Sequence, residues 1–228
     1  LNIGHEKCLS AHGTVTALAW VLQGQPTYAF EGIINFTGAT ISWMRDQLQL
    51  IADPAETETL ARSVSDSDGV YFIPAFVGLS APYWRSDARA AILGMTPSTT
   101  RAHVVRAALE SIGFIVTDVL KAMGGDAGVK LSIVYADGGA VRNSFLMQFI
   151  ADLNQLKVRA AQTPELSALG AVYSGCLGLK IYSSVEELER LPFGFVEYTA
   201  TKDPDNANGL FAAWQSAVQQ VLYKHKQG

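Results

Sequence analysis

Residues 133–143 of the chain are Ile-Val-Tyr-Ala-Asp-Gly-Gly-Ala-Val-Arg-Asn, and residues 144–150 continue as Ser-Phe-Leu-Met-Gln-Phe-Ile. The apolar run at the start contains β-branched residues, which predicts a short buried strand. The Asp-Gly-Gly at residues 137–139 predicts a tight turn, because glycine adopts backbone angles that other residues avoid. The stretch therefore indicates a strand that ends in a glycine-rich turn.

A helix is expected after this turn, because apolar residues recur there at four-residue spacing. They are Val141, Phe145, Phe149 and Leu153. A strand that enters a helix through a glycine-rich turn leaves backbone N–H groups free and presents the positive end of the helix dipole. This arrangement suits an anionic ligand. Asp-Gly-Gly is also common in turns that need glycine only because a side chain would not fit. The motif by itself therefore leaves a binding site and a plain turn as alternatives.

Composition excludes several classes of protein. The chain has 228 residues, of which 49% are hydrophobic and 17% charged, so it has enough apolar surface to bury a core. The net charge of −4 and the absence of a basic run argue against a nucleic-acid partner. No apolar run approaches the roughly 20 residues of a membrane span. Two distant cysteines, Cys8 and Cys176, fit structural thiols in a reduced cytoplasmic setting.

The remaining pattern predicts a hairpin followed by alternating helices and strands. Strands are expected over residues 13–22, 27–34, 70–74, 133–136 and 157–161, and helices over residues 39–50, 55–64, 99–123, 165–177 and 204–224. Gly124-Gly125 is expected to end the long central helix, and residues 75–89 are expected to be irregular. The order favours a mixed sheet with helices on both faces. Residues 1–4 look like the end of a first strand that is otherwise missing from the sheet.

Individual residues in these elements carry further expectations. Ile41, Met44 and Leu48 are expected to point inward from the first helix. In the helix that begins at Thr163-Pro164-Glu165, small residues predict a face for close packing, and Cys176 is expected to be buried there.

Four segments together resemble the FGGY family of carbohydrate kinases. They are residues 69–84, 94–110, 137–148 and 168–173. They occur in the family's order and spacing, and the similarity runs from residue 1 to about residue 179. One such motif is weak, but four in order favour the binding-site interpretation of the Asp-Gly-Gly turn. Residues 74–84 favour the members that phosphorylate glycerol.

The resemblance implies an α/β fold that is actin-like and ribonuclease-H-like, built as two domains with ATP and Mg²⁺ in the cleft between them. Residues 1–228 correspond to the C-terminal, nucleotide-binding domain, and the N-terminal domain is absent from this chain. In the family, the general base and the polyol-binding side chains belong to the N-terminal domain. We therefore expect no catalytic residue and no metal ligand in this chain, and no useful phosphorylation by it alone.

The resemblance also implies the residues that contact the nucleotide. The ATP-binding positions are Gly38, Ser42, Gly139 and Asn143, and the supporting turn consists of Asp137 and Gly138. Asn143 is expected one helical turn beyond the glycines. Family members often have glutamine at the position of Ser42, so the shorter side chain puts that adenosine-side contact in doubt.

Two other functions stay open. One is a related kinase acting on a pentulose such as xylulose, and the other is a non-catalytic nucleotide-binding or assembly module of the same fold, which the shorter Ser42 favours. The expected partner is a small polyol or sugar, with no nucleic acid and no membrane. Family resemblance also implies assemblies of identical chains. His103 is interpreted as a polar contact at a helix start, and residues 74–84 as a packed loop at a domain interface.

Overall fold

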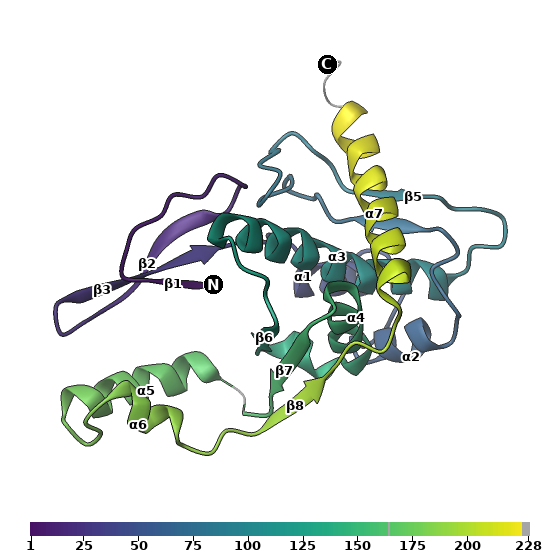
Figure 1. The fold of residues 1–228 in the computed structure, drawn as a ribbon. Helices are drawn as coiled ribbons and strands as arrows, with labels where there is room; N and C mark the ends of the chain where they lie inside the picture. The colour runs from purple at the N-terminus through teal and green to yellow at the C-terminus, as the bar shows by residue number, and fades with distance from the viewer. Residues whose placement is uncertain (164, 225–228) are drawn as a thin grey trace.

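The computed structural model describes residues 1–163 and 165–224. Pro164, which belongs to the predicted start of a helix, lies outside the described residues. The elements in chain order are β1 Asn2–Gly4, β2 Val15–Leu22, β3 Gln25–Glu31, α1 Gly38–Asp46, α2 Glu56–Arg62, β4 Tyr71–Ile73, β5 Ala91–Leu93, α3 Arg101–Ala127, β6 Ile133–Ala136, η1 Gly139–Arg142 (a 3₁₀ turn), α4 Ser144–Asn154, β7 Lys157–Ala161, α5 Leu166–Gly178, α6 Val185–Glu189, β8 Phe195–Tyr198 and α7 Pro204–Lys224. Figure 1 shows their arrangement around the central helix α3.

The strands form three separate sheets rather than the single sheet that the sequence predicts. Their orders are β1-β3-β2, β4-β5 and β6-β7-β8. The predicted hairpin is confirmed as the antiparallel pair β2 and β3. The third sheet is mixed, because β7 pairs parallel with β6 and antiparallel with β8. β1 and β6 each lie at the edge of their sheet. Within the described residues, no strand pairs with both of them, so the sheet that contains the hairpin and the mixed sheet stay separate.

Helix α3 is the centre of the fold, as its wide apolar face predicts, but its predicted end at Gly124-Gly125 is wrong. The helix runs on to Ala127, and Gly128 then takes the left-handed conformation that ends many helices. Glycine inside a helix costs only about 1 kcal/mol. The extra turn places Asp126 where its carboxylate accepts hydrogen bonds from Ser10, Ala11, His12 and Thr14, which holds the loop before β2.

The two largest hydrophobic clusters pack on the sides of α3. One contains apolar side chains of α1, α2, α4 and β7, and the other joins α3 and α4 to α7 and the irregular residues after β4. Ile41 and Met44 are buried as predicted, but the prediction for Leu48 is wrong. Helix α1 ends at Asp46, so Leu48 lies beyond it and is 41% exposed.

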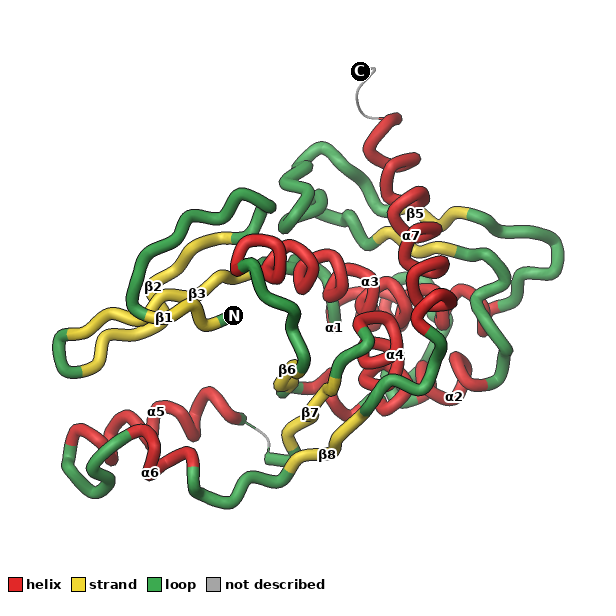
Figure 2. Tube along the Cα trace, in the orientation of Figure 1, coloured by secondary structure: helices red, strands yellow, loops and turns green. Residues whose placement is uncertain are grey.

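Helices α5 and α6 extend away from this core, as Figures 1 and 2 show. Helix α5 has no buried residue. The predicted close packing of its small residues is therefore wrong for the described chain, and Cys176 is only half-buried. The short strands β5 and β8 are not among the strands that the sequence predicts.

Candidate functional site

The Asp-Gly-Gly turn follows β6 directly, and its geometry explains the first glycine. Gly138 has φ 84° and ψ −173°, a region that is essentially restricted to glycine. Gly139 then starts the 3₁₀ turn η1, and α4 begins only at Ser144. The side chain of Asn143 caps α4 by accepting a hydrogen bond from the Leu146 N–H at 2.9 Å. Asn143 is thus the N-cap of α4, a position that asparagine strongly favours. It lies one turn of 3₁₀ helix beyond Gly139.

A second set of contacts closes the N-terminus of α4 from the side of α2. Glu58 accepts hydrogen bonds from the Ser144 N–H at 3.0 Å, from the Ser144 hydroxyl, and from Arg62. Burial works against the charge of Glu58, but the contacts with Ser144 and Arg62 outweigh it and hold the pKa of the carboxyl below its usual value. Asn143 Nδ2 also donates to Thr57 Oγ1 at 3.1 Å. The end of α4 is therefore already occupied by a carboxylate.

The turn before α4 is open by contrast. Gly138, Gly139 and Ala140 are exposed, and a Cβ atom added at either glycine would meet nothing within 4 Å. Among the described residues, none accepts a hydrogen bond from the N–H groups of these three residues. Unpaired backbone N–H groups at the start of a helical turn suit an anion such as a phosphate.

A comparable corner lies at the start of α1. Thr37 is the N-cap but makes no capping hydrogen bond through its side chain. Gly38 is exposed, with nothing within 4 Å of an added Cβ. Ser42 lies four residues further on, which puts it on the same face of the helix as Gly38. The buried Thr40 hydroxyl between them has no hydrogen-bond partner among the described residues.

The two corners share one hydrophobic core. Ile41 and Met44 of α1 belong to the same buried cluster as Leu146 and Met147 of α4, and Val141 of the 3₁₀ turn packs against it. A cavity of about 430 Å³ is lined by Asp137, by the end of β6 and by side chains of α5 and β8. Of the six predicted site residues, only Asp137 lines this cavity. The described structure thus connects the corners through packing and places Asp137 toward α5.

Sequence analysis did not single out Thr57 and Glu58, which position Asn143 and Ser144. Each contact joins residues 86 positions apart, so no local spacing could reveal it. The interpretation of His103 is confirmed, because its Nδ1 accepts the Thr100 N–H at 3.0 Å at the start of α3. In the irregular segment, Tyr83 is half-buried and donates to Asp118, whereas Trp84 is 50% exposed and donates to the carbonyl of Gly13.

The described residues contain no group of three or more His, Cys, Asp or Glu side chains that could hold a metal ion. None of their helices is long and apolar enough to cross a membrane.

A mixed sheet flanked by helices, with open glycine corners beside it, is an arrangement that suits a ligand carrying phosphate groups. The chain belongs to the FGGY family of carbohydrate kinases: residues 1–179 match the family's C-terminal domain. Its α/β fold is accordingly the actin-like fold of that family.

Within the family, glycerol kinases are among the most similar relatives. The glycerol kinase of Shewanella frigidimarina is 43% identical over 97% of this chain and 44% of its own length. The glycerol kinase of Dechloromonas aromatica is 44% identical over 98% of this chain. The structure of Plasmodium falciparum glycerol kinase with ADP has a TM-score of 0.89 at 33% identity and covers 97% of this chain. The chain spans less than half the length of these relatives.

Proposed function

We propose that the chain is the C-terminal, nucleotide-binding half of an ATP-dependent glycerol kinase, an enzyme that converts ATP and glycerol into ADP and glycerol 3-phosphate in the cytoplasm. The observation that carries the proposal is the identity of 43% to a glycerol kinase along 97% of the chain. The Plasmodium relative was crystallised with ADP, which supports a nucleotide as the ligand. Xylulose kinase structures resemble this chain at 18% identity, a level that supports the fold alone.

In this proposal the two glycine corners hold the nucleotide. Gly38 and Gly139 provide backbone N–H groups and space close to the main chain, while Ser42 and Asn143 contribute side-chain contacts to ATP. Asp137 and Gly138 shape the turn. The unpaired N–H groups of the turn fit the phosphate-bearing ligand. Mg²⁺, when bound, would neutralise phosphate charge; we propose that it arrives held by the phosphates of the nucleotide, since the described residues offer no metal-ligating cluster.

Calorimetric titration of the chain with ADP and Mg²⁺ tests this assignment. Gly139→Val should weaken binding at least about tenfold, because the side chain fills the open space before the turn while the backbone of Gly139 lies outside the left-handed region. Asn143→Ser keeps an N-cap oxygen for α4 but removes the amide, which also donates to Thr57. A loss of affinity with an unchanged thermal unfolding midpoint therefore reports on the ligand.

The matched control is Gly209→Val, on the surface of α7, where an added Cβ also meets nothing within 4 Å. It should leave ADP affinity unchanged. Unchanged affinity in both Gly139→Val and Asn143→Ser, or no binding by the parent chain, would refute the assignment.

A further inference from the structure

The side-chain amide of Asn143 is held at both of its ends. Its Oδ1 accepts the Leu146 N–H at 2.9 Å, and its Nδ2 donates to Oγ1 of Thr57 at 3.1 Å. Because a backbone N–H can only donate, the first contact requires that the oxygen of the amide faces α4. The nitrogen therefore faces α2, and turning the amide over would break both hydrogen bonds.

The hydroxyl of Thr57 imposes the same direction on the amide independently. It carries one proton, which it donates to the carbonyl of Pro54 at 2.6 Å. The oxygen of Thr57 can then only accept, so the nitrogen of the Asn143 amide suits it and the oxygen does not. Thr57 is 1% exposed, so water does not compete for this hydrogen bond. A buried hydroxyl on α2 thus dictates how the amide after the glycine turn is oriented.

Helix α2 is itself anchored to the core, which makes Thr57 a fixed point. Arg106 of α3 donates to the carbonyls of Ala61 and Val64 at 3.0 and 2.6 Å. These contacts occupy carbonyl groups at the C-terminal end of α2 that have no partner within the helix. Arg106 also pairs with Glu110 at 2.7 Å, and both side chains are buried. The position of α2 is therefore set by α3.

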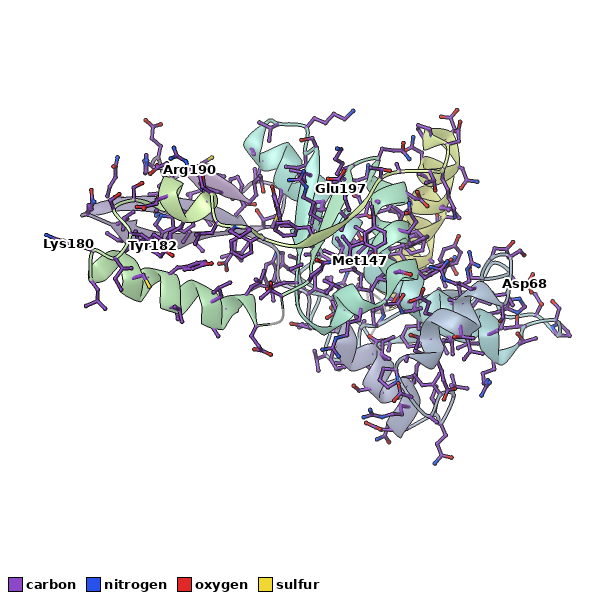
Figure 3. The ribbon with its side chains drawn as sticks, turned by 90° about the horizontal axis from the view of Figure 1, so that it is seen from below. Asp68, Met147, Lys180, Tyr182, Arg190 and Glu197 are labelled. Atoms are coloured by element: carbon purple, nitrogen blue, oxygen red, sulfur yellow. The ribbon has the colours of Figure 1, made fainter. Side chains whose placement is uncertain are left out.

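A second contact between α2 and α4 lies directly beside the first. Glu58 accepts the Ser144 N–H at 3.0 Å, so two neighbouring residues of α2 hold two neighbouring residues at the start of α4. In Figure 3, Asp68, which follows α2, and Lys180, which follows α5, lie on opposite sides of Met147 of α4, and Figure 1 agrees for the helices. Helix α2 thus holds α4 on the side away from α5.

The fixed amide keeps one hydrogen-bond donor for a ligand. Nδ2 of Asn143 carries two protons, and among the described residues only Thr57 accepts a hydrogen bond from it. Asn143 is half-buried and directly follows the 3₁₀ turn, whose first N–H groups are unpaired and suit phosphates. The start of α4 already holds the carboxylate of Glu58. The free donor is therefore offered to an uncharged part of a nucleotide.

We propose that Thr57 is a positioning residue of the nucleotide site, whose hydroxyl orients the amide of Asn143 so that it offers an N–H, and not a carbonyl oxygen, to the nucleoside part of ATP or ADP. This inference rests on the proposed function, in which Asn143 contacts the nucleotide. Because Thr57 is buried, it acts through Asn143 and not by touching the ligand. The nucleoside atom that meets Asn143 is then a hydrogen-bond acceptor.

Calorimetric titration of the 228-residue chain with ADP and Mg²⁺ separates the hydroxyl of Thr57 from its methyl group. Thr57→Val keeps the shape of the side chain but removes the hydroxyl. It should weaken ADP binding about tenfold, because the amide loses its fixed direction. Thr57→Ser keeps the hydroxyl and removes the methyl group. It should bind ADP within about twofold of the parent chain, although the small cavity lowers its thermal unfolding midpoint. The reverse pattern of affinities would overturn the proposal.

Two further variants separate this role from a general structural one. Thr59→Val is the matched control, because Thr59 is exposed on the same helix, and it should leave ADP affinity unchanged. In an Asn143→Ser background the amide is absent, so adding Thr57→Val should cause no further loss of ADP affinity. Equal losses caused by Thr57→Val in the parent chain and in this background would show that Thr57 does not act through Asn143, and would overturn the proposal.

If Thr57→Val does not fold, NMR of the Asn143 side-chain amide in the parent chain gives the same test. On binding of ADP, the Nδ2 proton that faces Thr57 should shift less than the other Nδ2 proton. A larger shift of the proton that faces Thr57, or no shift of either in a chain that binds ADP, would overturn the proposal. Failure of the proposed nucleotide site has a different signature, because then the parent chain does not bind ADP or Asn143→Ser binds it equally well.

Discussion

At the scale of single residues, the two neighbouring glycines of the turn differ in what they require. Gly138 needs glycine for its own backbone, since φ 84° with ψ −173° is closed to side chains. Gly139 has no such constraint, and a Cβ atom there would meet nothing. In the proposed site, the missing side chain leaves the space before the turn open for the nucleotide. The sequence predicts that both are glycine-dependent but does not tell these reasons apart, because the backbone angles become known only with the fold.

Asp118 is the residue whose titration should be visible in the stability of the chain. It is buried on α3, where its Oδ2 accepts hydrogen bonds from Tyr83 at 2.9 Å and from Trp214 at 2.8 Å. Burial raises the pKa of Asp118 to about 6, although the hydrogen bonds from Trp214 and Tyr83 and the charge of Lys121 act in the opposite direction. An unfolded aspartate titrates near pH 3.9.

We predict that Asp118 makes the chain less stable as the pH rises from about 4 to about 6. In this window the folded state holds a proton that the unfolded state has released, so folding stability is full below pH 4 and falls by up to about 3 kcal/mol through pH 6. Asp118→Asn keeps an acceptor oxygen but removes the titration. Urea unfolding at several pH values should therefore show that the free energy of unfolding of the variant increases relative to that of the parent chain as the pH rises. Parallel pH curves for the two proteins would contradict this account.

At the scale of elements, the crossing of α3 and α4 depends on Gly113. A Cβ atom there would lie 2.5 Å from Cδ1 of Phe149. The Phe149 ring cannot easily move, because it packs edge-on against Phe114 and parallel to Phe145. This close approach lets the two helices share the core that supports both the 3₁₀ turn and α7.

We predict that Gly113→Ala lowers the free energy of unfolding by about 1–3 kcal/mol, because it overpacks this crossing. The matched control is Gly125→Ala in the same helix, where the added Cβ would meet the His12 ring at an ordinary 3.4 Å. That change should stabilise the chain by up to about 1 kcal/mol, since alanine is the better helix former. Thermal unfolding measures both, and equal effects of the two substitutions would contradict the packing argument.

The elements also show where sequence reasoning is sufficient. Residues 157–161 form the predicted strand, and α7 starts at the predicted Pro204, with Asp203 accepting the Asp205 N–H. These features follow from local periodicity and capping. The end of α3 does not, because the helix continues to place Asp126 against residues more than 100 positions away. The N-cap role of Asn143 depends similarly on a helix start that Glu58 and Thr57 support from α2.

At the scale of the whole molecule, the order of helices and strands is predictable but the joining of the sheets is not. The sequence pattern predicts which residues form strands. Which strands pair into one sheet depends on contacts between residues that are far apart in the sequence. β1 and β6 remain edges in the described structure. The exposure of α5 is unpredictable for the same reason, since an apolar helix has the same pattern whether its partner is present or absent.

We predict that the 228-residue chain alone does not phosphorylate glycerol at a useful rate. In the proposed function, the general base and the glycerol pocket belong to the other half of the enzyme. Lack of the base lowers the rate about 10²–10⁴-fold. Loss of substrate positioning raises the activation barrier by up to roughly 7–11 kcal/mol more. A coupled assay of ADP release with glycerol should show turnover in a chimera in which this chain replaces the matching segment of the Shewanella frigidimarina glycerol kinase. The chain alone should show none above background. Turnover by the chain near that of the chimera would contradict the prediction.

The central claim is that the two glycine corners bind the nucleotide, and amide chemical-shift mapping by NMR during titration with ADP and Mg²⁺ tests it most directly. We predict that the largest shifts fall on Gly38 and Ala39 at the start of α1 and on Gly139, Ala140 and Asn143 before α4. Shifts confined to the cavity between α5 and β8, around Tyr173 and Phe195, would contradict the account, as would the absence of any shift at either corner.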